Sequence, residues 1–558
     1  MSGTPPYVEL HCHSAFSFLD GVSLPDELIQ RAAELGHTAL ALTDHNSVSG
    51  SMELARAAGD HGVRAIHGAE IDLAGGHHLT LLVRDAQGWS NLCRILTRAH
   101  AHTREGRARG EPAVALESVM ERAEGLLCLT GCAERGVRDE ITARRLLDAF
   151  GPEGLRVELQ RPYARHDRAR NRALAALARR LGVECVATGD VHAHARSRAE
   201  LQDAFVALRL HSTLEACEPR RRPNHSHVLS TPRAMASRFA EHPEAVCETL
   251  NLAESLSFDL CSDLGYRYPG AEDPDSLSRL VELCQARLDD RYGPGQCRAG
   301  ERAQAEGRLR EELHVIDELG LAGFFLLHHE MLELAREVAT EVRGRGGEGH
   351  GVDSPRSLLA PGRGRGSSVS SIVCYLTGLS HIDPIRNRLL LGRFLHTGLE
   401  SLPDIDLDFP REIREVLIPR VHEHFGSERT ALVAAFPTFR ARGAIRELGK
   451  VLGLPAGEIE RVARSAERGY GPTQPAEHEL SSGSERWAWL ARLVAEAQRL
   501  PRHLSQHSGG MVVATRPLID CCPVVPAAMA GRQKVQWDKD SCADAGFLKI
   551  DLLGLGML

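Results

Sequence analysis

The sequence predicts an α/β fold for the N-terminal part of the chain, and two observations support this. Short apolar runs such as YVELHCH, TALALTDH, VRAIHGAEIDL and HHLTLLVRD indicate strands. Helical patterns such as PDELIQRAAELG, which ends at a glycine, and SGSMELARAAGDHG lie between strands. This β-α-β-α order continues to about residue 210 and is typical of a parallel sheet or barrel.

Helices dominate the next part of the chain. Residues 195–260 are expected to be largely helical, and DSLSRLVELCQARLDDRYG and ERAQAEGRLREELHVIDELG are the clearest helices after them. A Gly- and Arg-rich loop is predicted at 342–360, before a mixed region that extends to about 433. A helical stretch then covers about 434–505, and the strands GGMVVAT and GFLKIDLL close the chain.

Composition narrows the class of protein. A chain of 558 residues has room for three or four domains of about 150 residues each. The net charge of -8 gives no global basic field, so any nucleic-acid surface has to be local. The 28 histidines favour metal sites, and the 14 scattered cysteines are typical of free thiols in a cytoplasm. Neither a signal peptide nor an apolar run of about 18 residues is visible, so we expect a cytoplasmic protein without a membrane partner.

Histidines and carboxylates follow the predicted strands of the first 200 residues. His11 and His13 lie two apart on the first strand and therefore point the same way. Further candidates lie at or near other strand ends: His45, Glu70, His78, Cys132, Asp190 and His192. An isolated histidine is usually a hydrogen-bonded core residue, but this set favours a centre for Zn²⁺, Mn²⁺ or Fe²⁺.

Three aspartates alternate with apolar residues in LPDIDLDF. A strand places Asp404, Asp406 and Asp408 on one face, where their negative charges repel one another. A divalent cation such as Mg²⁺ or Mn²⁺ relieves this repulsion, whereas a solvated edge strand is the plainer alternative. Farther along, Lys549 and Asp551 share one face of GFLKIDLLG, where a simple ion pair is the ordinary interpretation.

The motifs LHCHSAFSFLDG, TDHNSVSG, GAEIDL, HLTLL, LTGC and GDVHA resemble the PHP domain, the polymerase and histidinol phosphatase domain. The resemblance implies a distorted (β/α)7 barrel that holds up to three metal ions, here Zn²⁺ or Mn²⁺, and hydrolyses phosphoesters. Glu70 would bridge two of the ions. The implied ligands are His11, His13, Asp20, His45, Glu70, His78, Cys132, Asp190 and His192.

The later motifs GRGSSVSSIVCYLTG, RFL, LPDIDLDF, FRARGAIRELGK, HLSQHSGGMVV, QWDKD and LKIDLLGL resemble the bacterial C-family DNA polymerases, the polymerase III alpha subunits. SQHSGG and QWDKD are most similar to the error-prone, ImuC-like branch that acts in damage tolerance. The resemblance implies a palm of the polymerase β-like nucleotidyltransferase type with a helical thumb. The implied domains are PHP 1–260, palm 261–433 and 507–558, and thumb 434–506.

The resemblance also assigns roles to residues of the palm and thumb. Two Mg²⁺ ions would bind the catalytic carboxylates Asp404, Asp406 and Asp551. The triphosphate of a dNTP would contact Gly366, Ser367, Arg393 and Lys549, and the DNA primer-template would contact Arg442, Arg446 and His507. A solvated helix face explains Arg442 and Arg446 almost as well.

Three functions remain open at this point. The first is DNA-directed DNA polymerase activity of the error-prone type, with a sliding clamp and mutagenesis-complex proteins as partners. The sequence ends soon after Asp551, before the fingers that the resemblance implies, so we expect little processive synthesis from this chain alone. The second is phosphoesterase or 3′-5′ exonuclease activity of the PHP centre only. The third is a non-catalytic fragment that binds partner proteins.

Overall fold

The computed structural model describes residues 7–105, 108–345, 362–399, 402–403, 405–468 and 485–554. The chain divides into two compact units, which we describe separately. Unit 1 comprises Met1–Leu264 and Ala435–Ser505, and unit 2 comprises Gly265–Ala434 and Gln506–Leu558. Among the described residues, no helix has both the length and the apolar character that a membrane span requires.

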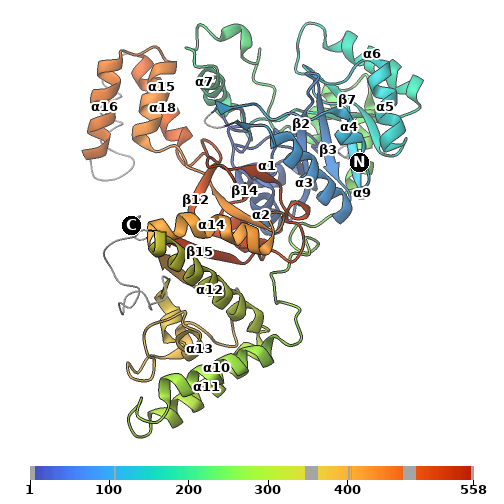
Figure 1. Cartoon of the computed structure of the whole chain (residues 1–558). Helices are drawn as coiled ribbons and strands as arrows, with labels where there is room; N and C mark the ends of the chain where they lie inside the picture. The colour runs from blue at the N-terminus through green and yellow to red at the C-terminus, as the bar shows by residue number, and fades with distance from the viewer. Residues whose placement is uncertain are drawn as a thin grey trace. The chain divides into compact units, whose positions relative to one another are not determined.

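Unit 1 is built around a curled six-stranded sheet with the strand order β1-β2-β3-β6-β7-β8 (Figure 1). The strands of this sheet are β1 Ala39–Leu42, β2 Arg64–Asp72, β3 His78–Val83, β6 Leu126–Leu129, β7 Leu155–Gln160 and β8 Cys185–Thr188. A separate two-stranded ribbon consists of β4 Arg104–Glu105 and β5 Ala108–Arg109. Most residues of the central strands are fully buried, as expected for a sheet with helices packed around it.

The first extended segment of the chain joins the two ends of this sheet. Glu9 forms a parallel bridge with Leu40 of β1, and Cys12 forms a parallel bridge with Val191, just after β8. With this segment the sheet has the seven extended elements that the PHP resemblance implies. The mixed α/β character and the barrel-like curl of the N-terminal part were therefore predicted correctly.

The expected parallel order holds for only part of the sheet. β3 is antiparallel to both of its neighbours, β2 and β6. β2 ends at Asp72 and β3 begins at His78, and a connection this short is a hairpin, since a parallel crossover needs a dozen residues or more. The other pairs, β1 with β2, β6 with β7 and β7 with β8, are parallel.

The helices of the N-terminal part pack around this sheet. They are α1 Pro25–Leu35, α2 Ser51–His61, α3 Ala86–His100, α4 Leu116–Met120, α5 Glu140–Phe150, α6 Asp167–Leu181, α7 Ala199–Arg209, α8 Pro232–Arg238 and α9 Pro243–Ser255. The predicted end of α1 is confirmed: Gly36 follows it with a φ of 82°, a left-handed conformation that glycine adopts without strain. The region 195–260 is helical only in part, since α7 ends at Arg209, α8 begins at Pro232, and the chain between them contains only a short 3-10 helix, Glu218–Arg220.

Three helices from the later part of the chain belong to unit 1. They are α15 Ala441–Val451, α16 Ala456–Arg468 and α18 Glu485–Ala497, which lie together in Figure 1. Their apolar faces share one core cluster with α7, in which Phe205 stacks on Phe439 with a centroid distance of 5.2 Å. The predicted helical stretch is thus confirmed, while the domain limits at 260, 433 and 506 stay predictions.

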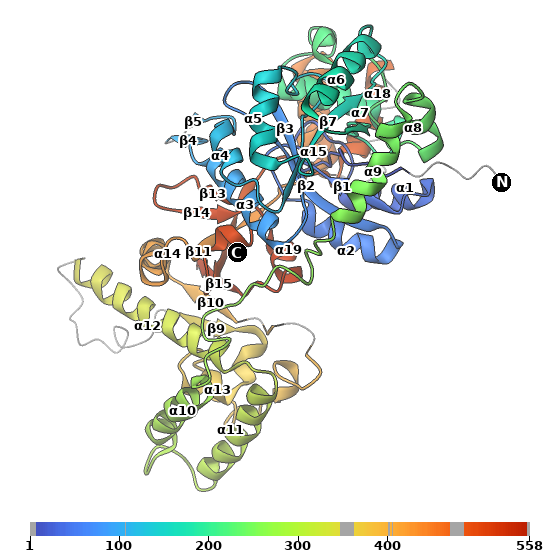
Figure 2. The same ribbon diagram turned by 90° about the vertical axis from the view of Figure 1, so that its right-hand side faces the viewer.

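Unit 2 contains a group of helices next to a second sheet (Figure 2). They are α10 Ser276–Tyr292, α11 Glu301–Glu318, α12 Ala322–Arg345, α13 Ile372–Leu376, α14 Arg411–Phe425 and α19 Lys539–Asp544. The start of the predicted loop at 342 was wrong, because α12 continues to Arg345. Most of the rest of the segment 342–360 lies outside the described residues.

The sheet of unit 2 has seven strands in the order β13-β14-β11-β12-β15-β10-β9. The strands are β9 Arg363–Arg365, β10 Asp406–Phe409, β11 Thr430–Ala435, β12 Ser505–Val513, β13 Val524–Pro526, β14 Gln533–Val535 and β15 Lys549–Gly554. The predicted alternation in LPDIDLDF is confirmed on its apolar side, because Ile405, Leu407 and Phe409 are all buried. The opposite face of β10 therefore presents its aspartates next to β15 and β9.

Candidate metal centres

The predicted ligands of unit 1 gather at one edge of the curled sheet. His45 follows β1, Cys132 follows β6 and Asp190 follows β8, and parallel strands end at the same edge. β3 runs in the opposite direction, so its first residue, His78, reaches this edge as well. Glu70 lies near the end of β2. The strand order therefore brings together side chains that are far apart in the sequence.

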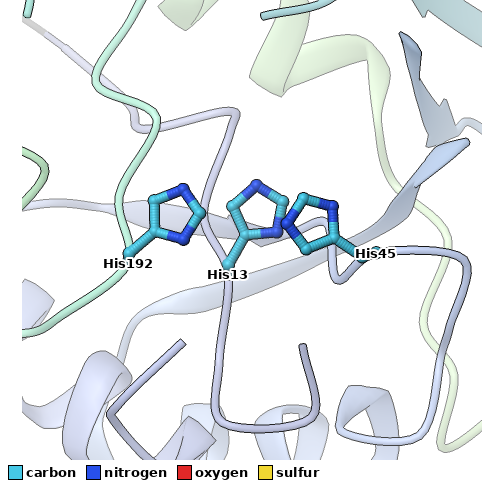
Figure 3. Close-up of side chains that lie close together, drawn as sticks. All are labelled: His13, His45 and His192. Atoms are coloured by element: carbon cyan, nitrogen blue, oxygen red, sulfur yellow. The ribbon is translucent and has the colours of Figure 1, made fainter. Parts of the chain in front are cut away.

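Three imidazoles form the middle of this cluster. His13 lies between His45 and His192 (Figure 3), with centroid distances of 4.2 and 4.4 Å and nearly parallel rings. Burial and the neighbouring His45 and His192 lower the pKa of His13 well below its ordinary value. The ring of His13 is consequently neutral at pH 7, which is the state of histidine that binds a metal ion.

Glu70 is the carboxylate at the centre of the cluster. Its Oε2 lies 2.9 Å from Nε2 of His11, its Oε1 lies 3.0 Å from Nδ1 of His45, and it also contacts Nδ1 of His78. Burial favours the neutral acid, but His45 and His11 hold the pKa of Glu70 well below its ordinary value. The buried Oε1 makes no hydrogen bond of normal geometry. Such an oxygen, close to imidazole nitrogens, suits a carboxylate that bridges metal ions.

The donor atoms fall into compact groups of three. Within each group they lie within 4.8 Å of one another. The groups are His13, His45 and His192; His11, His13 and Glu70; Glu70, His78 and Cys132; and Asp190, His192 and His227. Imidazole, carboxylate and thiol donors in this arrangement fit Zn²⁺ or Mn²⁺. Divalent metal binding is therefore the chemistry that this edge supports, although the identity of the ion stays a proposal.

Asp20 completes the set of nine predicted residues. Its Oδ2 lies 3.0 Å from Nε2 of His45 and 3.8 Å from Nδ1 of His192. Asp20 belongs to none of the donor groups found among the described residues, and two arginines, Arg209 and Arg222, lie close to its carboxylate. The structure thus brings all nine residues to one place, and the ligand role of each stays a prediction.

Two functional candidates in this cluster were missed by sequence reasoning. Glu158 of β7 is buried, and its Oε1 lies 2.7 Å from Nδ1 of His11. A carboxylate in this position orients the ring and leaves Nε2 for a metal ion. His227 places Nδ1 3.2 Å from Oδ2 of Asp190. The available signals were a charged residue within a buried strand for Glu158 and the HSH spacing for His227.

The second candidate centre lies in unit 2, where two aspartates are neighbours on adjacent strands. Asp406 of β10 and Asp551 of β15 are direct partners in the parallel register. Their side chains are 26% and 7% exposed, so both are shielded from bulk water. Asp408 is 19% exposed and belongs to the same face, whereas Asp404 lies outside the described residues.

Cationic side chains surround these aspartates. Nζ of Lys549 lies 2.7 Å from Oδ2 of Asp551. Arg365 of β9 lies 3.5 Å from Asp406 and 3.4 Å from Asp408, and sequence reasoning did not single it out within the GRGRGS motif. These contacts balance part of the negative charge. Oδ1 of Asp551 is buried and has no hydrogen-bond partner among the described residues, which fits a cation ligand.

His507 lies at the edge of this second centre. Its Nδ1 accepts a hydrogen bond of 2.7 Å from the backbone N–H of Gly510, whose register partner is Asp551. The same nitrogen lies 4.0 Å from Oδ1 of Asp551. Burial lowers the pKa of His507, so its ring is neutral at pH 7. The predicted contact of His507 with DNA stays a prediction, but its place beside Asp551 is a structural fact.

The predicted triphosphate contacts are only partly described. Gly366 follows β9 directly, is exposed and has a φ of 77°, which favours glycine. Ser367 is exposed beside it in a short 3-10 helix, Gly366–Ser370. The side chain of Arg393 lies outside the described residues. An exposed turn next to β10 fits a contact with phosphate, and the triphosphate contacts of Gly366 and Ser367 stay predictions.

The two arginines predicted to contact DNA lie on α15 in unit 1. Arg446 forms a two-pronged ion pair with Glu460 of α16, with distances of 2.8 and 2.6 Å. This pair lowers the pKa of Glu460 to about 2, and it gives Arg446 a structural explanation that needs no DNA. Arg442 is partly exposed on the same helix. Contacts of either arginine with DNA stay predictions.

Two protein families match the chain. The PHP domain matches residues 9–184, which include most of the strands of the curled sheet. The Bacterial DNA polymerase III alpha NTPase domain matches residues 356–554, which include both strands of the aspartate pair. Each candidate centre therefore has candidate ligands within a matched region, while Asp190, His192 and His227 lie beyond residue 184.

Several curated relatives are named error-prone DNA polymerase. That of Mycolicibacterium paratuberculosis is 36% identical over 577 residues, which cover 99% of this chain and 50% of the relative. That of Pseudomonas aeruginosa is 37% identical over 560 residues, which cover 99% of this chain and 51% of the relative. The chain thus spans about half the length of the curated relatives it matches.

One solved structure is similar to part of the chain. An amidohydrolase from Chromobacterium violaceum is 20% identical and covers 34% of this chain and 88% of its own, with a TM-score of 0.26. A likeness of this size carries no argument about the reaction.

Proposed function

We propose, from the matches to the PHP domain and the Bacterial DNA polymerase III alpha NTPase domain and from the names of the curated relatives, that this chain takes part in DNA synthesis of the error-prone type. The reaction is the transfer of a nucleotide from a dNTP to the 3′ end of a DNA primer. A cytoplasmic location and, as partners, a sliding clamp and proteins of a mutagenesis complex belong to the same proposal.

The observation that carries the proposal is the register of Asp406 and Asp551. Two carboxylates side by side on neighbouring strands, one with a buried oxygen that finds no hydrogen-bond partner in the described part of the chain, are suited to hold divalent cations. Asp404, two residues before Asp406, is proposed as the third carboxylate. Bound Mg²⁺ ions would lower the pKa of the primer hydroxyl and neutralise the triphosphate.

The side chains around the aspartates have separate tasks in this proposal. Lys549 and Arg393 offset the charge of the triphosphate, and the backbone N–H groups of Gly366 and Ser367 orient it. Arg442, Arg446 and His507 are proposed to position the primer-template. These contacts are with phosphates and do not read the base sequence, as expected for an enzyme that copies any template.

The test is the addition of a single nucleotide to a labelled primer by the purified chain in Mg²⁺ or Mn²⁺. Asp551→Asn keeps the size of the side chain but removes the charge, so addition is expected to fall by more than about 100-fold. Asp540→Asn, at an exposed aspartate of α19, is the matched control and is expected to keep wild-type addition. Wild-type addition by the Asp551→Asn variant would refute the proposal.

A second function is favoured by the cluster at the sheet edge of unit 1. Nine predicted ligands converge there, and the groups around Glu70 fit Zn²⁺ or Mn²⁺. We propose metal-dependent hydrolysis of phosphoesters at this centre, with a DNA 3′ end as the substrate. Release of nucleotides from single-stranded DNA in Mn²⁺ tests this. His11→Ala is expected to abolish release and Asp551→Asn to leave it unchanged, whereas the opposite pattern would refute it.

A further inference from the structure

An arginine side chain reaches into the metal-ligand cluster of unit 1. Arg222 follows the short helix Glu218–Arg220 in the irregular chain between α7 and α8. Its Nη1 lies 2.8 Å from Oδ1 of Asp20, and its Nη2 lies 2.6 Å from Nε2 of His192. Its side chain is only 16% exposed. The guanidinium therefore contacts two of the nine predicted ligands in a largely buried position.

These contacts differ from those of the other central carboxylate. Asp20 faces two guanidinium groups, since Nη1 of Arg209 also lies 3.4 Å from its Oδ2. The ion-pair partners of Glu70 among the described residues are all imidazoles. A guanidinium cannot lose its proton in a protein, so the positive charge at Asp20 is permanent. The negative charge of Asp20 is therefore neutralised by arginines of the protein, whereas the negative charge of Glu70 can be neutralised by metal ions.

The contact with His192 blocks a ligand atom. Nε2 of His192 lies 2.6 Å from Nη2 of Arg222 and 3.0 Å from Oδ1 of Asp190. Whether this nitrogen carries a proton for Asp190 or accepts one from Arg222, it has no free lone pair for a metal ion. Arg222 also lies near Asp190, whose charge helps to raise the pKa of the arginine. Asp20, His45 and His192 form one corner of the cluster, which we call the Asp20–His192 corner. Arg222 contacts two of these three side chains, Asp20 and His192.

The chain around Arg222 is held by a hydrogen bond to another loop of unit 1. Nδ2 of Asn224 donates a 2.6 Å hydrogen bond to the carbonyl of Pro162, in the loop after β7. The preceding residue, Arg221, points elsewhere and pairs with Asp203 at 2.8 Å. Of these two consecutive arginines, only Arg222 contacts the cluster, and Arg221 therefore offers a matched control.

We propose that Arg222 acts as a fixed cation at the Asp20–His192 corner and takes the place of a third metal ion. Divalent ions bind at the two groups built on Glu70, one with His11 and His13 and one with His78 and Cys132. The corner of Asp20, His45 and His192 binds no ion while Arg222 is present. This inference rests on the proposed metal centre and specifies how many ions it takes.

The test counts the ions directly. Crystals of the chain are soaked in Mn²⁺, and anomalous difference peaks are counted within the cluster. We expect two peaks in the wild-type protein, three in Arg222→Gln, and two in Arg222→Lys, which keeps the positive charge. Arg221→Gln is expected to keep the wild-type count. Bound manganese measured in solution by mass spectrometry is expected to rise by one ion per chain in Arg222→Gln alone.

The outcomes separate this inference from the metal centre itself. Three peaks in the wild-type protein, or an unchanged count in Arg222→Gln, would overturn the role of Arg222 and leave the metal centre standing. No peak in any variant would overturn the metal centre, and the inference with it. If Arg222→Gln fails to fold, the wild-type and Arg222→Lys counts still decide, since three peaks in either contradict the proposal.

Discussion

Asp406 and Asp551 are direct neighbours in the parallel register of β10 and β15, and the ammonium of Lys549 lies 2.7 Å from one oxygen of Asp551. Two carboxylates this close raise each other's electrostatic energy, and partial burial adds the cost of lost hydration. Lys549 relieves part of this repulsion. The other oxygen of Asp551, Oδ1, has no hydrogen-bond partner among the described residues, so Asp406 and Asp551 together can bind a cation.

The ion pair predicts that Lys549 competes with metal ions for Asp551. Lys549→Met removes the positive charge, so the affinity of unit 2 for Mn²⁺ without nucleotide is expected to rise roughly fivefold, or about 1 kcal/mol. The affinity for a dNTP is expected to fall, because the triphosphate loses a cationic partner. Isothermal titration calorimetry with Mn²⁺, with and without dNTP, measures both effects.

Lys539 is the matched control for this experiment. It is an exposed lysine of α19 whose ammonium lies 3.8 Å from Asp540. Lys539→Met is expected to change neither affinity. Equal effects of the two substitutions would mean that only the general field of the protein matters, and the specific pairing of Lys549 with Asp551 would be excluded.

The contact between Glu158 and His11 predicts a role in metal affinity. Glu158→Gln keeps the shape of the side chain but removes the charge that polarises the His11 ring. The affinity of the unit 1 centre for Mn²⁺ is expected to fall about 10- to 100-fold, as is typical for a residue that orients a ligand. Glu153→Gln, at a side chain that is 88% exposed, serves as the control. Wild-type affinity of Glu158→Gln in equilibrium dialysis would contradict the prediction.

Two glycines of α15 are predicted to respond in opposite ways to alanine. A methyl group at Gly443 meets nothing within 4 Å, and alanine favours a helix, so Gly443→Ala is expected to raise the free energy of unfolding by about 0.5–1 kcal/mol. At Gly449 the methyl group meets Cγ1 of Ile459 on α16 at 2.9 Å. Gly449→Ala is expected to lower the free energy of unfolding by about 1–3 kcal/mol. Urea unfolding of both variants measures the difference, and equal changes would show that α15 and α16 do not pack as described.

A buried histidine of α12 predicts acid sensitivity. His328 is fully buried, and burial lowers its pKa to about 4, although Nδ1 donates a 2.8 Å hydrogen bond to the carbonyl of Phe324. The unfolded chain, with a histidine pKa of about 6.5, binds the proton more readily between pH 6.5 and 4. The folded state is therefore destabilised as the pH falls through this window, by about 2 kcal/mol between pH 7 and pH 5.

Comparing two variants isolates this effect. His328→Leu is expected to lose about 2 kcal/mol less than the wild-type protein when urea unfolding at pH 5 is compared with pH 7. His314→Leu, at a histidine side chain that is 71% exposed, is expected to follow the wild-type protein. A wild-type pH dependence in His328→Leu would show that other groups cause the acid sensitivity.

Local patterns in the sequence were sufficient for much of the fold. The end of α1 at Gly36, the apolar face of β10 and the helical stretch that contains α15 all follow from periodicity and turn residues. The antiparallel direction of β3 did not follow, since periodicity identifies a strand but not its partner. The end of α12 was predicted too early, because a Gly- and Arg-rich composition favours a loop, whereas the helix continues to Arg345.

The candidate sites show the same division. HxH and DxH spacings pointed to residues such as His13 and His192, because neighbours two apart on a strand share a face. Glu158, Arg222 and His227 were missed, because each is brought to the cluster from another segment of the chain. The sequence offered a charged residue within a buried strand and an HSH spacing as signals for Glu158 and His227, but neither signal says which distant residues these side chains meet.

The sequence by itself determined which residue types alternate on each strand, and therefore that carboxylates and imidazoles line faces suited to metal ions. Only the tertiary structure decided which of these faces meet. It set Asp406 beside Asp551 through the pairing of β10 with β15, and it placed Arg222 against Asp20 and His192. The physical reason is that side-chain period is a local property of the backbone, whereas strand pairing and the approach of distant loops depend on the packing of the whole unit.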